Sequence, residues 1–301
     1  MILCENMYIT KRKICVITGA SSGIGKATAL ALASKKFVVI LVCRNRTEGE
    51  NTKKEIIKTT GNKRISLMLA DFTSLKSIKQ LADNIKVKYK HVDILINNAG
   101  VLYSKRTLTQ DKYETTFQVN YLAPFFLTLL LINLLKNGAT SRIINITSDE
   151  HVRGHIDFDN LHGEKKYSGY GAYARSKLAL ILFTYKLAEK LENTKISVNC
   201  VHPGSVATNI GRNSTGLMGI YFKMGKRFML KPEEGCKRIV YLAISRDVEG
   251  VTGKYFINNK AVSSSRLSYN KQLSNLLWLN TIKLIRQKID FDNHAFNLGL
   301  S

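Results

Sequence analysis

A tyrosine and a lysine stand four residues apart in the stretch Tyr173-Ala174-Arg175-Ser176-Lys177. On a helix this spacing places both side chains on one face, one turn apart. The apolar run that follows Lys177 indicates that this helix is largely buried. A lysine held beside a tyrosine in an apolar setting favours the tyrosinate, because positive charge stabilises the anion. We therefore expect Tyr173 to exchange a proton near neutral pH, although a pair that merely packs, with the lysine reaching water, has the same spacing.

A glycine-rich stretch near the start of the chain separates a predicted strand from a predicted helix. The strand is the apolar run at 14–17, and the helical pattern follows from Ala27 to Ala33. Between them lies the sequence Gly19-Ala20-Ser21-Ser22-Gly23-Ile24-Gly25. Such glycines let backbone N–H groups approach a pyrophosphate, and the helix N-terminus favours its charge. A tight turn alone would explain one glycine but not three after a threonine. The stretch therefore predicts a dinucleotide site.

The residues after the second predicted strand bear on which dinucleotide binds. That strand is expected at 37–42, and Cys43 and Arg44 follow it. An acidic side chain at this point would bind the ribose 2′-hydroxyl of NAD, whereas a guanidinium can hold the 2′-phosphate of NADP. We therefore predict NADP(H). The alternative is that Arg44 is a surface arginine, like Arg46 nearby.

Strands and helices alternate along the rest of the chain. Further strands are predicted at 65–69, 92–96, 143–146, 196–201 and 253–257. Further helices are predicted at 48–59, 78–87, 113–135 and 240–244, with one more that bears Tyr173. This alternation predicts an α/β fold: one domain with a Rossmann-type, doubly wound parallel β-sheet and helices on both faces. Ligands of such a sheet bind outside the carboxyl ends of its strands.

Several candidate residues fall at those carboxyl ends, namely Gly19 to Gly25, Arg44, Asp71 with Phe72, Asn98-Ala99-Gly100, Thr147-Ser148 and Pro203-Gly204. Asp71 either contacts the adenine ring or caps the helix that starts near Ser74, and the two roles can coexist. Taken alone, Ser148 is better explained by capping of the backbone after its strand than by catalysis. No Gly-x-Ser-x-Gly elbow surrounds it, which argues against hydrolase chemistry.

Composition limits the remaining classes of protein. The chain has 301 residues, 45% of them hydrophobic, which is enough for one large α/β domain. Five cysteines without a CxxC pair indicate reduced thiols in a cytosol-facing protein and give no zinc site. The apolar stretch at 122–135 is too short to span a bilayer and predicts a buried helix. The first 13 residues resemble no signal peptide.

The formal net charge is +24, from 46 Lys and Arg against 22 Asp and Glu. Such a balance points to an anionic partner, either an acidic membrane surface or, less favoured, nucleic acid. The basic residues are spread along the chain, so a plain solvated surface is the main alternative. We expect no specific nucleic-acid binding, and a location in the cytoplasm or peripherally on the cytosolic face of an intracellular membrane.

Taken together, these motifs resemble the short-chain dehydrogenase/reductase signature in order and spacing, over roughly residues 11–260. The residues that carry the resemblance are Thr18-Gly19-x-x-x-Gly23-x-Gly25, Asn97-Asn98-Ala99-Gly100, Asn120, Ser148, Tyr173-x-x-x-Lys177 and Pro203-Gly204. Within the family, the retinol dehydrogenase branch is the most similar. That likeness lies in Cys43-Arg44-Asn45 with Gly49-Glu50, in 160–165, in 172–183 and in 201–204.

The resemblance implies roles for individual residues. Tyr173 would be the general acid and base, and Lys177 would lower its pKa and hold the nicotinamide ribose. Ser148 would stabilise the substrate oxygen, and Asn120 would position a water in a proton relay to Lys177. The implied cofactor-binding residues are Gly19, Ser21, Ser22, Gly23, Ile24, Gly25, Arg44, Asn45, Asp71, Phe72, Asn98, Ala99, Gly100, Tyr173, Lys177, Pro203, Gly204, Val206 and Thr208.

The implied activity is NADP(H)-dependent hydride transfer to or from a lipophilic carbonyl or alcohol, most simply a retinal or retinol. A reductase of steroids or xenobiotic carbonyls is one alternative, and a non-catalytic NADP-binding regulatory protein is another. Two features depart from the family pattern. The hydrophobic N-terminal anchor of many relatives is not seen, and Tyr121-Leu122-Ala123-Pro124 follows Asn120 where relatives often have His-Leu-Gly-His.

Three parts of the chain are expected: an extension at 1–12, the catalytic domain at 13–262, and a C-terminal amphipathic helix and tail at 263–301. Within the domain, 205–230 is expected to cover the substrate. Its aromatic and basic segment at 213–229 suggests either a lid that touches anionic lipid or an ordinary covering helix with a solvated face. The C-terminal helix would pack on the domain, with a homodimer or membrane contact as alternatives.

Overall fold

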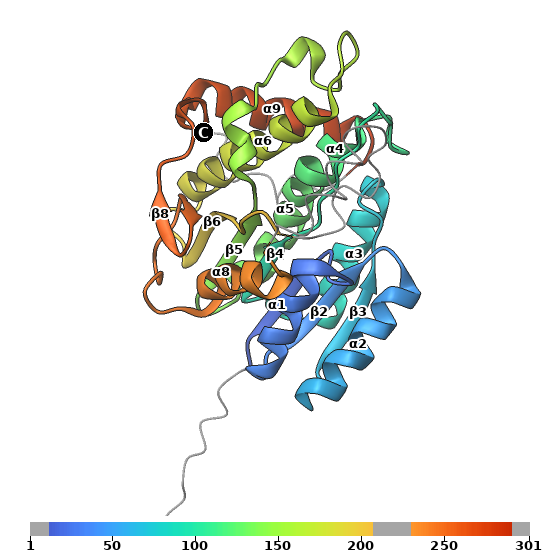
Figure 1. The fold of residues 1–301 in the computed structure, drawn as a ribbon, viewed down its shortest axis with the longest axis vertical. Helices are drawn as coiled ribbons and strands as arrows, with labels where there is room; N and C mark the ends of the chain where they lie inside the picture. The colour runs from blue at the N-terminus through green and yellow to red at the C-terminus, as the bar shows by residue number, and fades with distance from the viewer. Residues whose placement is uncertain (1–11, 207–229, 291–301) are drawn as a thin grey trace, which may run out of the picture.

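An eight-stranded sheet runs through the computed structural model, which describes residues 12–206 and 230–290 (Figure 1). Its strands lie in the order β3-β2-β1-β4-β5-β6-β7-β8. Their bounds are β1 Ile14–Thr18, β2 Val38–Cys43, β3 Ile65–Leu69, β4 Ile94–Asn97, β5 Ser141–Ile146, β6 Ile196–His202, β7 Lys254–Ile257 and β8 Lys260–Val262. Strands β1 to β7 pair in parallel, and β8 returns antiparallel to β7.

The order of the strands reverses at β1, which pairs with β2 on one side and with β4 on the other. Val16 illustrates the register, since it lies opposite Ile40 of β2 and Leu95 of β4. In an open parallel sheet the crevice at such a reversal is where ligands bind. The Rossmann-type sheet expected from the sequence is confirmed.

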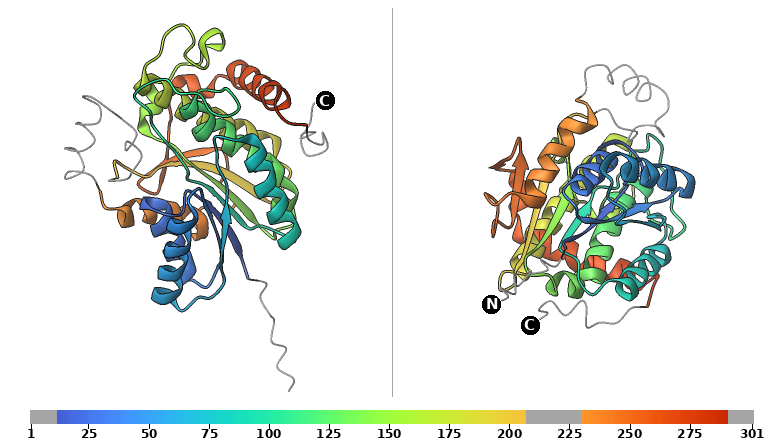
Figure 2. Two further views of the ribbon diagram at one scale, coloured as in Figure 1. Left: turned by 90° about the vertical axis from the view of Figure 1, so that its right-hand side faces the viewer. Right: turned by 90° about the horizontal axis from the view of Figure 1, so that it is seen from below.

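Helices cover both faces of the sheet, and two apolar clusters fill the two layers (Figure 2). Helices α1, α2 and α8 pack on one face, while α3, α5 and α6 pack on the other. The bounds are α1 Gly23–Ser34, α2 Arg46–Thr60, α3 Leu75–Lys88, α4 Thr115–Phe117, α5 Ala123–Lys136, α6 Gly169–Lys190, α8 Pro232–Ile244 and α9 Lys271–Arg286. Near-continuous apolar strands follow from burial on both faces.

The predicted long helix at 113–135 differs in detail. Its first turn is the short α4, and a π-helical turn, η1, spans Gln118–Leu122 before α5 begins. Glu114 caps the start, since its carboxylate accepts hydrogen bonds from the backbone N–H groups of Thr116 and Phe117. Periodicity alone does not distinguish a π turn from α-helix here, because residues 113–132 are all buried and no exposed face marks the change in register.

Short strand β8 was not predicted. All three of its residues, Lys260 to Val262, are exposed, so the strand lacks the apolar pattern on which strand prediction depends. A tight turn joins it to β7, and both Asn258 and Asn259 have positive φ, at 50° and 63°. Consecutive positive φ angles are typical of two-residue hairpin turns, and asparagine tolerates them.

The C-terminal helix α9 packs against the main domain, as its amphipathic pattern predicts. Trp278 is 4% exposed and its ring lies against Phe125 of α5 and Phe183 of α6, at centroid distances of 4.9 and 6.0 Å. Leu276 and Leu279 on the opposite side of the helix are each 51% exposed. Segments 1–11, 207–229 and 291–301 lie outside the described residues, and with them the expected N-terminal extension and most of the substrate-covering segment.

Candidate active site

A cleft of about 850 Å³ lies over the carboxyl ends of the strands. Every expected cofactor residue in the described part of the chain lines it, from the glycine-rich turn through Arg44, Asp71 and Asn98 to Val206. Ser148, Tyr173 and Lys177 lie on its wall as well. Thr208 is outside the described residues. The structure thus brings together residues that are more than 180 positions apart in the sequence, Gly19 and Val206 being the extremes.

The glycine-rich turn leaves no space for side chains. A Cβ atom on Gly25 would lie 2.3 Å from the carbonyl oxygen of Gly19, which itself has a φ of +65°. Asn98 fixes this turn from the end of β4, because its Nδ2 donates hydrogen bonds to the carbonyl oxygens of Thr18 and Gly19 at 2.8 and 3.2 Å. The backbone of the turn therefore lies open to the cleft, as close approach to a pyrophosphate requires.

Helix α1 begins directly behind this turn. Its N-cap, Ser22, makes no side-chain capping hydrogen bond, and the first turn holds no acidic residue. The N–H groups at the helix start are thus available to an anion, and the helix dipole favours negative charge there. Together with the glycine cradle, this end of the cleft fits the pyrophosphate of a nicotinamide dinucleotide.

At the far end of the cleft, Arg44 and Asn45 are exposed on the loop between β2 and α2. Asn45 caps α2 by accepting a hydrogen bond from the backbone N–H of Glu48 at 3.0 Å. The Glu48 carboxylate also lines this end and accepts a hydrogen bond from the Ser21 hydroxyl at 3.3 Å. Glu48 was not among the residues predicted from the sequence, because it does not follow β2 directly. Its position one turn into α2 would have been the signal.

Asp71 lies in the cleft but does not cap helix α3. Its carboxylate accepts hydrogen bonds from the backbone N–H and the hydroxyl of Thr73, at 2.9 and 2.8 Å. The cap is Ser74, whose hydroxyl accepts from the N–H of Ser77. The capping alternative for Asp71 was therefore wrong, because a serine nearer to the helix start takes that position.

Tyr173 and Lys177 lie one turn apart on α6, as expected, and both face the cleft. The Lys177 Nζ lies 5.5 Å from the centroid of the Tyr173 ring and donates a hydrogen bond to the carbonyl oxygen of Ile146 at 2.9 Å. Burial lowers the pKa of Lys177 to about 8. A buried ammonium with a single carbonyl partner is poorly compensated, which explains that direction.

The pKa of Tyr173 differs from expectation. Burial raises it well above the usual value, and the charges of Asp149 and Glu150 raise it further, while a hydrogen bond with Ser148 lowers it. The expected lowering by Lys177 is not seen in this arrangement, because desolvation of the phenolate outweighs the other contributions. In the structure as it stands, Tyr173 is a neutral phenol and thus a proton donor.

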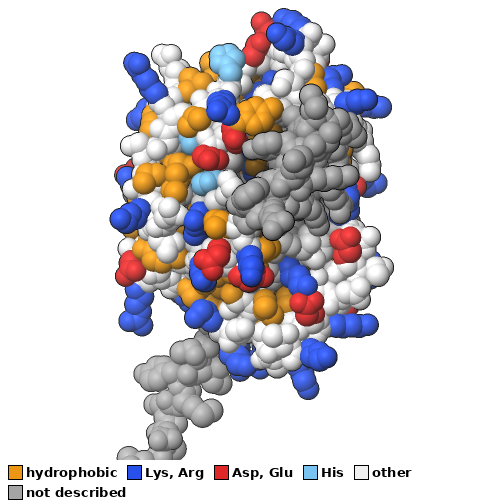
Figure 3. All heavy atoms as spheres, in the orientation of Figure 1, with side chains coloured by type: hydrophobic (Ala, Val, Ile, Leu, Met, Phe, Trp, Pro, Cys, Tyr) orange, Lys and Arg blue, Asp and Glu red, His pale blue; other side chains and the backbone are white. Residues whose placement is uncertain are grey.

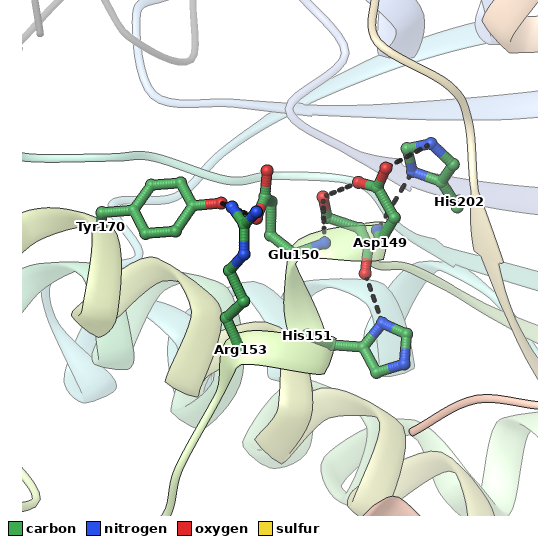
Figure 4. Close-up of polar contacts among 7 residues, drawn as sticks. Asp149, Glu150, His151, Arg153, Tyr170 and His202 are labelled. Atoms are coloured by element: carbon green, nitrogen blue, oxygen red, sulfur yellow. Dashed lines mark hydrogen bonds and ion pairs between the residues drawn. The ribbon is translucent and has the colours of Figure 1, made fainter. Parts of the chain in front are cut away.

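Ser148 follows β5 and caps a short 3₁₀ turn, η2 (Asp149–Arg153). Its hydroxyl donates a hydrogen bond to the Asp149 carboxylate at 3.0 Å and accepts one from the N–H of Glu150 at 3.3 Å. His202, at the end of β6, accepts from the Asp149 N–H at 3.4 Å (Figure 4). The serine is thus both a capping residue and part of the cleft wall, so the two readings of the sequence coexist.

Asn120 does not line the cleft. It lies in the π turn and is 1% exposed. Its side-chain amide bonds both backbone polar groups of Val101, at 2.8 and 2.9 Å, and the hydroxyl of Ser176 at 3.0 Å. The side chain therefore braces the loop after β4 and the helix that carries Tyr173. Its expected contact with a water near Lys177 remains a prediction.

The wall beyond Ser148 holds further residues that the sequence analysis missed. Arg153 donates a hydrogen bond to the hydroxyl of Tyr170 at 2.7 Å and lies 3.5 Å from the Glu150 carboxylate (Figure 4). Leu102, Tyr103 and Val119 add an apolar side. Their places in the sequence could have indicated that they lie in the wall. Asp149 and Glu150 directly follow Ser148, and Tyr170 lies one helical turn before Tyr173.

The described residues also bear on metal binding and on membrane insertion. Among the described residues, 12–206 and 230–290, no group of three or more His, Cys, Asp or Glu could hold a metal ion. In the same described ranges, one stretch, Thr115–Lys136, is long and apolar enough to cross a membrane, but 94% of its apolar 18-residue window is buried inside the protein. That burial is typical of a core helix, as the sequence predicted.

The fold and cleft define a class: an α/β nucleotide-binding oxidoreductase with an open parallel sheet. Residues 13–216 match the model of the family described as short chain dehydrogenase. The chain is 39% identical to human Retinol dehydrogenase 13 over 289 residues, which cover 94% of this chain and 87% of the human protein. It is 38% identical to mouse Retinol dehydrogenase 12, covering 94% and 89%, respectively. The protein belongs to the short-chain dehydrogenase family.

Solved structures agree. A protein from Mycobacterium Paratuberculosis superposes with a TM-score of 0.74 at 27% identity, covering 93% of this chain and 95% of that one. A short chain dehydrogenase from Escherichia coli CFT073, complexed with NADPH, superposes with a TM-score of 0.65 at 26% identity, covering 81% and 95%, respectively. The family, the glycine cradle and the uncapped helix start together define an oxidoreductase that binds a nicotinamide cofactor.

Proposed function

We propose that the protein is an NADP(H)-dependent oxidoreductase that interconverts a lipophilic carbonyl and its alcohol, with a retinal or retinol-like substrate. The observation that carries the proposal is the convergence of Tyr173, Lys177 and Ser148 on one cleft with the glycine-rich turn. The likeness to retinol dehydrogenases and the apolar wall of Leu102, Tyr103 and Val119 favour the substrate class. A steroid or xenobiotic carbonyl is the alternative that the same wall would accept.

The nicotinamide supplies or accepts the hydride when it is bound in the cleft. The chain's own residues do the rest. In reduction, the Tyr173 phenol donates its proton to the substrate oxygen. The Ser148 hydroxyl, which donates to the Asp149 carboxylate in this structure, turns to donate its one hydrogen bond to the same oxygen, which stabilises the developing charge. Lys177 holds positive charge on the same side of α6, and it offsets the charge left on the phenolate. Asn120 forms hydrogen bonds with both the loop after β4 and helix α6, and thereby fixes their relative position.

The preference for NADP(H) rests on Arg44, which is exposed at the adenosine end of the cleft. A guanidinium there can bind a 2′-phosphate through two hydrogen bonds. The structural relatives complexed with NADPH and NADP point the same way. Replacement of Arg44 by Gln should therefore lower kcat/KM with NADPH about tenfold or more and leave that with NADH nearly unchanged.

The decisive experiment is oxidation of NADPH followed by absorbance, with all-trans-retinal, steroid ketones and simple aldehydes as substrates. Turnover of retinal that falls by a factor of about 10³ in Tyr173→Phe, with NADPH affinity retained, would support the proposal. Turnover of steroid ketones or simple aldehydes but not of retinal would replace the retinal-like substrate by one of those classes. Tight NADPH binding without turnover of any carbonyl would favour the non-catalytic regulatory alternative.

A further inference from the structure

A buried histidine, His151, forms a hydrogen bond with the turn that carries Ser148 (Figure 4). Nδ1 of His151 lies 2.7 Å from the carbonyl oxygen of Ser148, and the backbone N–H of Ser265 points at its Nε2 from 3.0 Å. A carbonyl oxygen can only accept a hydrogen bond and a backbone N–H can only donate one. Nδ1 must therefore carry the proton and Nε2 must be bare, so both contacts require one neutral tautomer.

The surroundings of the ring hold it in place. His151 is 1% exposed, and its ring meets the ring of Tyr255 of β7 edge-on at 5.0 Å. Ser265 belongs to the segment between β8 and α9, so the imidazole bridges the carboxyl end of β5 to the C-terminal part of the chain. The two hydrogen bonds of the ring thus join the turn after β5 to the segment between β8 and α9. We call this pair of hydrogen bonds the clamp.

We infer that His151 is a positioning residue: it fixes Ser148 in the cleft through its Nδ1–H, and the N–H of Ser265 holds the ring in the tautomer that does so. The inference rests on the proposed function, in which Ser148 donates to the substrate oxygen. The clamp holds the Ser148 carbonyl, and the Glu150 N–H and Asp149 carboxylate bind its hydroxyl. A shift of about 1 Å in such a group can cost about a hundredfold in rate.

The charge state of the ring follows from its neighbours. Burial lowers the pKa of His151, while the Ser148 carbonyl and the Asp149 carboxylate act in the opposite direction. Two further titratable groups lie nearby: burial raises the pKa of Tyr255, whose ring packs on His151, and burial lowers the pKa of His202 at the end of β6. A proton on Nε2 would face the Ser265 N–H. The clamp is therefore intact above the pKa of His151 and is lost as the pH falls through it.

Two substitutions separate the halves of the clamp. An asparagine amide can reach the Ser148 carbonyl but not Ser265, whereas a glutamine oxygen can reach Ser265 but leaves the Ser148 carbonyl without its donor. We expect His151→Gln to lower kcat about tenfold or more with unchanged affinity for NADPH, and His151→Asn to stay within about threefold of wild type. His155→Asn, at an exposed histidine four positions on, is the matched control.

A double-mutant cycle tests whether His151 acts through Ser148. In a Ser148→Ala background, His151→Gln should lower kcat much less than it does in wild type, because the group it positions is gone. Equal losses in both backgrounds would overturn the inference, as would wild-type kcat in His151→Gln. A merely structural role would lower the unfolding temperature in both backgrounds without this coupling.

Ser265→Pro removes the N–H group that faces Nε2 together with the Ser265 hydroxyl, and the φ of −62° at Ser265 suits proline. Selective ¹⁵N labelling of histidine reports the tautomer without any substrate. We expect His151 in wild type to be neutral with its proton on Nδ1. In Ser265→Pro we expect a higher pKa for His151 and a kcat that falls less steeply as the pH is lowered. An Nε2–H ring, or an unchanged pKa, would overturn the clamp. If wild type turned over no carbonyl, the proposed function would fail while these spectra would still decide the clamp.

Discussion

Lys177 illustrates how a single buried charge can be costly and useful at once. It is 3% exposed, and its ammonium donates a hydrogen bond to the carbonyl oxygen of Ile146. The pKa of about 8 means that the folded state disfavours the charged form, whose usual pKa is 10.5. Burial of a weakly compensated charge at a reactive site is a common reason for marginal stability there.

We predict that Lys177→Met abolishes turnover yet removes a pH-dependent cost from folding. Between about pH 8 and 10.5 the unfolded chain holds the lysine proton more tightly than the folded protein does, so wild-type stability rises with pH in that window. The difference in unfolding free energy between wild type and variant should shift by on the order of 2 kcal/mol from about pH 7 to 9.5. Urea denaturation at the two pH values measures it.

The exposed Lys195→Met serves as the control, because the Lys195 side chain lies in solvent and its ammonium is not buried on folding. The structure indicates that the Lys177 ammonium is desolvated. Unfolding free energies of wild type and Lys177→Met that change with pH by the same amount would contradict this.

Glu48 is a second residue whose charge matters, because its carboxylate lies at the end of the cleft where Arg44 would hold a 2′-phosphate. A carboxylate there repels a phosphate and can accept a hydrogen bond from a ribose hydroxyl. We predict that Glu48→Gln raises the ratio of kcat/KM for NADPH over NADH about three- to tenfold. The ratio is obtained from initial rates with each cofactor.

Glu50→Gln on the same helix is the matched control, since Glu50 does not line the cleft and lies 3.9 Å from the Lys53 Nζ. An unchanged ratio in Glu48→Gln, or an equal rise in both variants, would remove Glu48 from cofactor selection.

At the scale of elements, helix α9 buries one face on α5 and α6 and leaves the other in solvent. Trp278 packs on Phe125 and Phe183, and the Lys190 ammonium lies 5.2 Å from its ring centroid. Hydrogen bonds tie the same region to the core, since Tyr121 and Thr281 join through their hydroxyls at 2.7 Å. The helix therefore belongs to the same packed unit as the π turn and α5.

We predict that Trp278→Ala destabilises the protein by about 3–5 kcal/mol, because a large buried side chain is lost and the space is not refilled. Leu279→Ala, one position on but 51% exposed, should change stability by less than about 0.5 kcal/mol. Chemical denaturation of both variants checks the pair. Equal, small effects would mean that α9 docks only loosely on α5 and α6.

At the scale of the whole molecule, basic residues are spread along the chain and over the face that Figure 3 draws. Figure 3 shows Lys and Arg side chains around the whole visible face, with acidic side chains among them. The surplus of 24 positive charges nevertheless creates a net field that attracts anions. That field favours a phosphate-bearing cofactor and an acidic membrane surface alike.

We predict weak binding to vesicles that contain acidic lipid at low salt, lost by about 0.5 M NaCl because dispersed charges are screened. Co-sedimentation with acidic and with neutral vesicles measures it. Binding that ignores lipid charge would exclude the electrostatic contact. Binding that survives high salt would point instead to an apolar contact, for which the exposed Leu276 and Leu279 of α9 are the candidates.

Much of the fold could be predicted because its signals are local. Apolar runs such as 65–69 match the observed strand β3 in full, and β1 and β2 begin and end within a residue of the predicted bounds. The cleft residues could be predicted as well, since parallel strands bring their carboxyl ends to one edge. Strand β8 and the π turn at Gln118–Leu122 were missed, because neither leaves an apolar period of its own.

The sequence by itself determined the glycine cradle, the Tyr173–Lys177 spacing on one helix face and the polar strand ends, because each depends on neighbours within a few residues. Only the tertiary structure decided the rest. Burial raises the pKa of Tyr173 although Lys177 is near, Asn120 turns to Val101, and Ser265 sets the tautomer of His151. Desolvation and hydrogen bonds between distant segments arise from packing, and packing is not a local property of the chain.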